Sequence, residues 1–195
     1  DAKREVGIAQ GNNYSPTALN AVLHYLLDLP LAATISSPLW FRYADNLCCL
    51  ARSVPEGQQV LADICQRLAP PGMALKGEDG VSDLRTNEAQ LLGFRIKYRD
   101  GRLICGLCSR TYDRLRENLR KAYDEIHPHL TACQVLKSWI TSYGPAFENG
   151  AADSSVVLLI AADLGFRELA SQESVQRWMQ EAGDLWRVFR QRSEH

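Results

Sequence analysis

The cysteines are the first candidates for chemistry in this sequence. The chain contains six, and Cys105 and Cys108 form a single Cys-x-x-Cys pair with His127, His129 and Cys133 downstream. Thiolates and imidazoles are the ligands of tetrahedral zinc sites. However, Cys105 lies in an expected strand, where residues three apart face opposite sides of the sheet, and no second pair accompanies the first. The pattern therefore favours reduced structural thiols over a zinc site.

A basic segment over residues 95–121 is a second candidate. It carries nine arginines and lysines against three acids, a net charge of +6, so the remainder of the chain carries −7. Clustered arginines and lysines are suited to nucleic-acid phosphates. A solvated helix face with i,i+4 ion pairs is the alternative interpretation of the same pattern.

An acid at the tip of a tight hairpin is the third candidate. Residues 39–43 and 47–51 have the aromatic and aliphatic content of strands, and Asp45 and Asn46 between them favour a turn. This arrangement predicts Asp45 at an exposed position with few degrees of freedom. A plain turn acid is the alternative, so the assignment depends on the motifs that flank the hairpin.

Hydrophobic periodicity predicts the helices that hold this hairpin. One helix over 17–27 follows Ser15 as N-cap and Pro16 at the first position, and it closes at Pro30. A second helix begins at the capping-box spacing of Ser53 and Glu56.

The second half of the chain combines strands and helices. Alternating apolar residues predict strands over 91–98 and 102–107, and the Asp100-Gly101 pair between them is a strong hairpin signal. Beyond residue 108 the spacing becomes helical. These elements predict an α+β fold, in which antiparallel hairpins pack with helices and a mostly helical region follows.

Composition is that of a soluble globular protein. The 195 residues are 46% hydrophobic and 23% charged, and the net charge of −1 gives no global sign of nucleic-acid binding. The longest apolar run, over 156–162, is too short to span a bilayer, and no secretion signal is visible. We therefore expect a cytoplasmic protein with no membrane partner.

Three motifs together resemble those of reverse transcriptases, in the family's order. Gln10-Gly11 followed by Ser15-Pro16 is similar to the Gln-Gly…Ser-Pro element of that family. Tyr43-Ala44-Asp45-Asn46 is similar to its Tyr-Ala-Asp-Asp hairpin, and Leu92-Gly93 to the Leu-Gly element of its primer grip. The overall style is closest to bacterial group II intron and retron enzymes.

The resemblance implies a division of the chain into three parts. Residues 1–108 correspond to part of a polymerase palm, 109–150 to a helical thumb and 151–195 to a helical C-terminal extension. It covers about residues 5–108 closely and extends more loosely to Tyr143.

The resemblance also implies an activity and a set of site residues. The activity is RNA-directed DNA polymerisation with Mg²⁺, and the partners are an RNA template, a DNA primer and deoxynucleoside triphosphates. Asp45 and Asn46 are the implied catalytic residues, with Asp45 as metal ligand. Nucleotide and template binding falls to Gln10, Gly11, Ser15, Pro16, Tyr43 and Ala44, and the primer grip to Leu92 and Gly93. We expect Arg110, Arg114 and Arg120 of the basic segment to contact the nucleic-acid backbone.

Departures from the family pattern qualify the expected activity, and one of them is that Asp79 stands where the family often has a lysine near the triphosphate, with Lys76 offset by three. The second acid of the family's hairpin is Asn46 here, which removes a full charge from the site. The family's other metal-binding aspartate lies on an earlier palm strand, and no such segment precedes Gly7. We therefore expect a longer protein whose fingers and upstream palm belong to an N-terminal segment, and poor Mg²⁺ binding by this chain alone. The alternative is a degenerate, non-catalytic nucleic-acid-binding or scaffold protein on the same fold.

Overall fold

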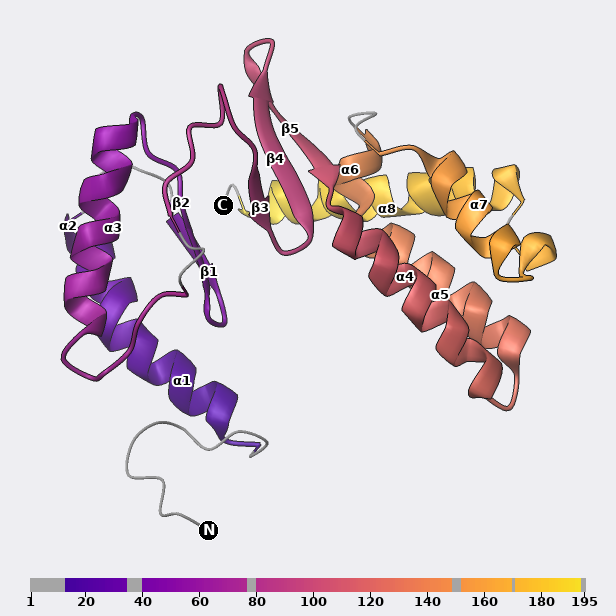
Figure 1. Cartoon of the computed structure of the whole chain (residues 1–195), viewed down its shortest axis with the longest axis horizontal. Coiled ribbons are helices and arrows are strands. Elements are labelled where there is room, and N and C mark those ends of the chain that lie inside the picture. The colour runs from indigo at the N-terminus through magenta and orange to yellow at the C-terminus, as the bar shows by residue number, and fades with distance from the viewer. Residues whose placement is uncertain (1–12, 35–39, 77–79, 149–151, 170, 194–195) are drawn as a thin grey trace. The chain divides into compact units, whose positions relative to one another are not determined.

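The structure, a computed structural model, describes residues 13–34, 40–76, 80–148, 152–169 and 171–193. These residues form helices and two small antiparallel sheets, so the expected α+β class is confirmed (Figure 1). The chain divides into two compact units, and the boundary along the sequence falls between Asp83 and Leu84. Among the described helices, none is long and apolar enough to cross a membrane.

The first unit is built on one long helical segment. It comprises α1 (Ser15–Leu23), a π-helical turn η1 (His24–Asp28) and α2 (Leu29–Thr34). The prediction that Pro30 ends the helix is wrong. Proline lacks the N–H that an α-helix requires and its ring clashes with the preceding turn, and the wide π-helical turn just before Pro30 lets the helix continue.

A hairpin and a further helix complete the first unit. Strands β1 (Trp40–Tyr43) and β2 (Asn46–Cys49) pair antiparallel, and α3 (Val54–Leu68) follows. The cap of α3 is confirmed, because the Ser53 hydroxyl accepts a hydrogen bond from the backbone N–H of Glu56. The core consists of buried leucines and isoleucine from the helices, against which Trp40, Leu47 and Cys49 pack: Leu23, Leu27, Leu31, Ile64 and Leu68.

The first helix begins one or two residues earlier than predicted, so Ser15 is not its N-cap. Ser15 is the first residue of α1, and Tyr14 occupies the cap with helical backbone angles and no side-chain cap. Pro16 nevertheless lies in the first turn, where its missing N–H costs no helical hydrogen bond.

The second unit contains a three-stranded sheet, β3 (Ala89–Leu91), β4 (Phe94–Arg99) and β5 (Arg102–Leu107), in that order. The prediction of one strand over 91–98 is wrong at its start. Leu92 and Gly93 both have positive φ and form a tight turn, so Leu91 pairs with Phe94. The predicted Asp100-Gly101 hairpin is confirmed, with positive φ at both residues and Arg99 opposite Arg102.

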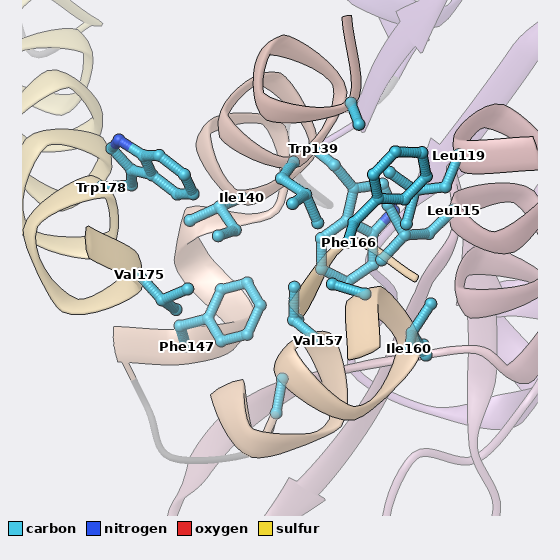
Figure 2. Close-up of a cluster of buried hydrophobic side chains, with 14 of the residues drawn as sticks. Leu115, Leu119, Trp139, Ile140, Phe147, Val157, Ile160, Phe166, Val175 and Trp178 are labelled. Carbon is cyan, nitrogen blue, oxygen red and sulfur yellow. The ribbon is translucent and has the colours of Figure 1, made fainter. Parts of the chain in front are cut away.

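Helices make up the remainder of the second unit, and they share one core. They are α4 (Ser109–Lys121), η2 (Ala122–Asp124), α5 (Pro128–Ser142), α6 (Gly144–Glu148), α7 (Ser154–Asp163), η3 (Arg167–Leu169) and α8 (Gln172–Ser193). Figure 2 shows side chains of α4, α5, α7 and α8 converging, among them Leu115, Ile140, Val157 and Trp178.

The packing divides the chain at a different place from the sequence prediction. Leu107 of β5 belongs to the same buried cluster as the helices, and Phe94 of β4 packs against it. The sheet therefore joins the helices in one unit, whereas the sequence placed a boundary at residue 108. Residues beyond 151 also contribute to that core, through Val157, Phe166 and Val175.

Candidate functional site

The tip of the β1–β2 hairpin is the centre of the candidate site. Tyr43 pairs with Asn46, so Ala44 and Asp45 form a two-residue loop. Ala44 has a φ of 55°, in the region that favours glycine, and this conformation costs an alanine about 1 kcal/mol or more. The turn therefore holds Asp45 at an exposed tip through a strained backbone.

The guanidinium of Arg42 fixes this turn to the helical segment. Its Nε and Nη2 donate to the two carboxylate oxygens of Asp28, at 2.8 and 2.6 Å, and its Nη1 donates to the side chain of Asn20 and to the carbonyl of Ala44, both at 2.8 Å. The side chains of Arg42 and Asp28 are only 11% and 18% exposed. Bidentate, charge-assisted pairs are among the strongest polar contacts in proteins. Residues of α1, η1 and the hairpin are thus joined by one side chain.

Electrostatics at Asp28 follow from this contact. The hydrogen bonds from Arg42 lower the pKa of the Asp28 carboxyl. Partial burial raises this pKa, but the positive charge of Arg42 lowers it further. His24 also lies beside it, with Nδ1 3.5 Å from a carboxylate oxygen. Asp28 therefore stays ionised as a counterion that keeps Arg42 in place.

Asp45 and Asn46 present the oxygen donors of the site. Both residues are exposed, and the Asn46 amide donates to a carboxylate oxygen of Asp45 at 3.2 Å. Carboxylate and amide oxygens suit Mg²⁺ in type, but a magnesium site draws on further carboxylates or substrate phosphates. Within the described ranges, no three His, Cys, Asp or Glu residues come together as a metal site. The hairpin thus carries a partial donor set.

The two faces of the hairpin differ in character. Trp40 and Arg42 lie on the inner face with Leu47, whereas Phe41 and Tyr43 lie on the outer face and are 45% and 67% exposed. Exposed aromatic rings can stack on nucleobases. The tip therefore presents a carboxylate next to an aromatic surface.

The first predicted motif is only partly described. Gln10 and Gly11 lie outside the described residues. Ser15 and Pro16 begin α1, whose Asn20 accepts the hydrogen bond from Arg42. The structure thus connects the Ser15–Pro16 helix directly to the hairpin that carries Asp45.

The predicted primer grip is a strained turn in the second unit. Leu92 has a φ of 51° and is 45% exposed, and the Gly93 carbonyl accepts hydrogen bonds from the Thr111 hydroxyl at 2.7 Å and the Cys108 N–H at 3.1 Å. A Cβ at Gly93 would lie 2.9 Å from the Thr111 hydroxyl oxygen and 3.0 Å from that of Tyr143. The turn is therefore fixed to the start of α4 by hydrogen bonds, and it lies close to Tyr143 at the end of α5. Its predicted position beside the Asp45 hairpin stays a prediction.

The basic residues of α4 fall into two groups. Arg116 and Lys121 pair with Asp113 and Glu117, at 3.0 and 2.7 Å. Among the described residues, no acid forms an ion pair with any of the three arginines predicted to contact nucleic acid, which are Arg110, Arg114 and Arg120. All three residues are exposed, and the positive charge of Arg114 also acts on the carboxylate of Glu117.

The cysteines are all free thiols. Burial raises the pKa of Cys105 and of Cys108, and it raises the pKa of Cys49 to about 11. Raised thiol pKa values oppose formation of the thiolate that would bind a metal or act as a nucleophile. The interpretation as structural thiols is consistent with this.

Comparisons with known proteins identify no relative. No family profile matches the chain, and no match appears among curated proteins or solved structures. The functional argument therefore depends on the residues and geometry of the chain.

Arg42 and its partner Asp28 belong to the site, but no sequence motif indicates them. A signal was present in the alternation of β1, which places Arg42 on the same face as Trp40 and therefore toward the core. An arginine on an inward face requires an acid partner. The partner, Asp28, lies in the π-helical turn, and the sequence pattern did not indicate that turn.

Proposed function

We propose that this chain is the palm and thumb part of an RNA-directed DNA polymerase, a reverse transcriptase. The observation that carries the proposal is the strained turn at Ala44 and Asp45, held by Arg42. Backbone strain persists only where the surroundings impose it, and strained positions cluster at active sites. A purely structural hairpin could use Asn-Gly or Asp-Gly at lower cost.

The proposed reaction joins a primer 3′-hydroxyl to the α-phosphate of a deoxynucleoside triphosphate and releases pyrophosphate. When bound, magnesium would neutralise phosphate charge and activate the hydroxyl. Asp45 and the side-chain oxygen of Asn46 would hold it, together with carboxylates from an N-terminal segment of the same polymerase. The described part of this chain contributes a fixed turn that presents these oxygens to substrate.

The remaining site residues bind and position the substrates in this proposal. Tyr43 offers its exposed ring to a base or sugar, and Ala44 keeps the approach to Asp45 narrow. Gln10, Gly11, Ser15 and Pro16 lie along the nucleotide and template, and Leu92 and Gly93 support the primer end. Arg110, Arg114 and Arg120 contact backbone phosphates.

A non-catalytic nucleic-acid-binding protein on the same fold is the second candidate. The hydrogen bond from Asn46 to Asp45 favours it, because an amide replaces a charge and occupies one carboxylate oxygen. In that case the hairpin would be retained for its shape, and the α4 arginines would carry the function.

Primer extension by the chain joined to its N-terminal segment tests the proposal. The test compares Asp45→Asn with Asp100→Asn, because both acids lie in two-residue hairpin turns and are exposed. We expect Asp45→Asn to abolish extension of a primed RNA template and Asp100→Asn to leave it unchanged. We expect Asn46→Asp to retain or increase extension, because the added charge strengthens cation binding.

Equal activity of the wild type and Asp45→Asn would refute the assigned site. An inert wild type that becomes active with Asn46→Asp would identify a disabled polymerase, and the second candidate would then be correct.

A further inference from the structure

One face of the three-stranded sheet carries a row of basic side chains. Strand alternation places Arg95, Lys97 and Arg99 on one face of β4, and Arg102 of β5 lies directly opposite Arg99. The other face carries Phe94, which packs against the helical core. We refer to Arg95, Lys97, Arg99 and Arg102 as the basic sheet face.

Few acids balance this face, and those present are weakly engaged. Glu88 lies 3.4 Å from Arg95 and 3.7 Å from Lys97, and Asp100 lies 3.4 Å from Arg99. These distances exceed those of good charge-assisted hydrogen bonds, and exposed pairs of this kind contribute little to stability. In the described part of the chain, Arg102 has no ion-pair partner.

The pairing of Arg99 with Arg102 is unfavourable for the hairpin itself. Like charges directly opposite on neighbouring strands repel, because their Cβ atoms lie only about 5 Å apart. An Asp100-Gly101 turn closes readily with neutral or oppositely charged flanking residues. The pairing thus costs folding stability, and a bound polyanion would relieve that cost.

We propose that the basic sheet face binds the phosphate backbone of a nucleic-acid duplex. Alternate residues of β4 place a positive charge about every 6.7 Å along the strand, so several phosphates of one backbone can be contacted at once. Figure 1 shows the turn of the β4–β5 hairpin projecting away from the helices of its unit, and the side chains of Arg99 and Asp100 at this turn are 72% and 80% exposed.

The side chains between the charges favour a duplex over a single strand. The partners of Arg95 and Lys97 on this face are Gly106 and Ile104, and none of the described strand residues on this face is aromatic. Single-strand sites combine a basic groove with aromatic rings that stack on exposed bases, whereas a duplex presents phosphates and keeps its bases inside. That the duplex is an RNA–DNA hybrid rests on the proposed function.

The decisive variant is Arg102→Glu, because binding and stability then change in opposite directions. The substitution replaces cross-strand repulsion of Arg99 with attraction, so the melting temperature of the full chain should rise. At the same time, we expect weaker salt dependence of binding to a short labelled RNA–DNA hybrid. The slope of log K against log salt concentration should become shallower by about one to two units. Arg177→Glu makes the same charge change at an exposed position of α8 and should leave that slope unchanged.

Several results would overturn the inference. These are no binding of the hybrid by the wild type, an unchanged slope for Arg102→Glu, an equal loss for Arg177→Glu, or a larger effect on single-stranded RNA than on the hybrid. If circular dichroism shows misfolding of Arg102→Glu, Arg102→Gln should still lower the slope by about one unit. Hybrid binding that depends on Arg102, in a completed protein that extends no primer, would reject the proposed function and retain this inference.

Discussion

Two of the three described hairpins, β1–β2 and β4–β5, form the same kind of tight turn with different residues. Both close with a two-residue loop whose first residue has positive φ. The β4–β5 hairpin uses Asp100 and Gly101, which suit that backbone, and it needs no external support. The β1–β2 hairpin uses Ala44 and Asp45, and its turn carbonyl depends on Arg42. Favourable turn chemistry serves the fold, whereas a strained and anchored turn indicates that the position of Asp45 matters.

Loss of the anchor should produce the largest difference between the hairpins. Arg42→Met leaves the Asp28 carboxylate without its partner in a mostly buried position, and we expect a local destabilisation of about 3 kcal/mol. Arg99→Met in the β4–β5 hairpin should change stability by less than about 0.5 kcal/mol, because that side chain is exposed, and in the stabilising direction, because the change removes the repulsion between Arg99 and Arg102. Hydrogen exchange of the β1, β2, β4 and β5 amides measures both changes.

The pH dependence of exchange provides a control for this comparison. The contribution of the depressed Asp28 pKa is present above the unfolded value, near 3.8, and is lost as pH falls through the folded pKa. Protection of β1 and β2 should therefore fall in acid in the wild type and vary less in Arg42→Met. Equal acid sensitivity in both proteins would contradict the role of the pair.

Glycine-to-alanine substitutions should destabilise the turn at Gly93 more than the turn at Gly101, because more side chains surround Gly93. At Gly93 a new Cβ meets Thr111 and Tyr143 in addition to a φ of +89°, and we expect a cost of about 2 kcal/mol. At Gly101 the φ is +80° but nothing lies within 4 Å of the new Cβ, so the cost should be about 1 kcal/mol. Chemical denaturation of the second unit measures the difference, and a larger cost at Gly101 would reverse the ranking.

Relief of strain at the first hairpin should have the smallest effect. Ala44→Gly removes the penalty of positive φ, and we expect a stabilisation of about 0.5 kcal/mol after the entropic cost of glycine. Amide exchange in β1 and β2 measures it. Destabilisation by this substitution would mean that Ala44 is not strained, and the contrast between the hairpins would disappear.

Local signals predicted more of the fold than of the site. Ser53, Asp100 and Gly101 determine the structure around them through caps and turn conformations, which depend on neighbouring residues only. The turn at Leu92 interrupted a run of alternating residues that is typical of a strand, and contacts of Gly93 with Thr111 and Tyr143 hold it. The sequence selected Asp45 as a candidate site residue through its motif. It did not identify the Arg42–Asp28 pair, because Asp28 is the last residue of a π-helical turn that the sequence pattern did not indicate.

The π-helical turn before Pro30 has a consequence for the phase of the helix. Residues four apart drift by about 40° around an α-helix, so Leu23, Leu27 and Leu31 would progressively rotate away from a common line. A wider turn uses more residues for each rotation and cancels part of that drift, and all three leucines are buried. The π-helical turn also sets the side of the helix from which the Asp28 side chain projects. One residue added or removed in this turn would rotate the helix that follows by about 100° relative to α1. The geometry of this single turn therefore determines whether Asp28 can pair with Arg42 of the hairpin.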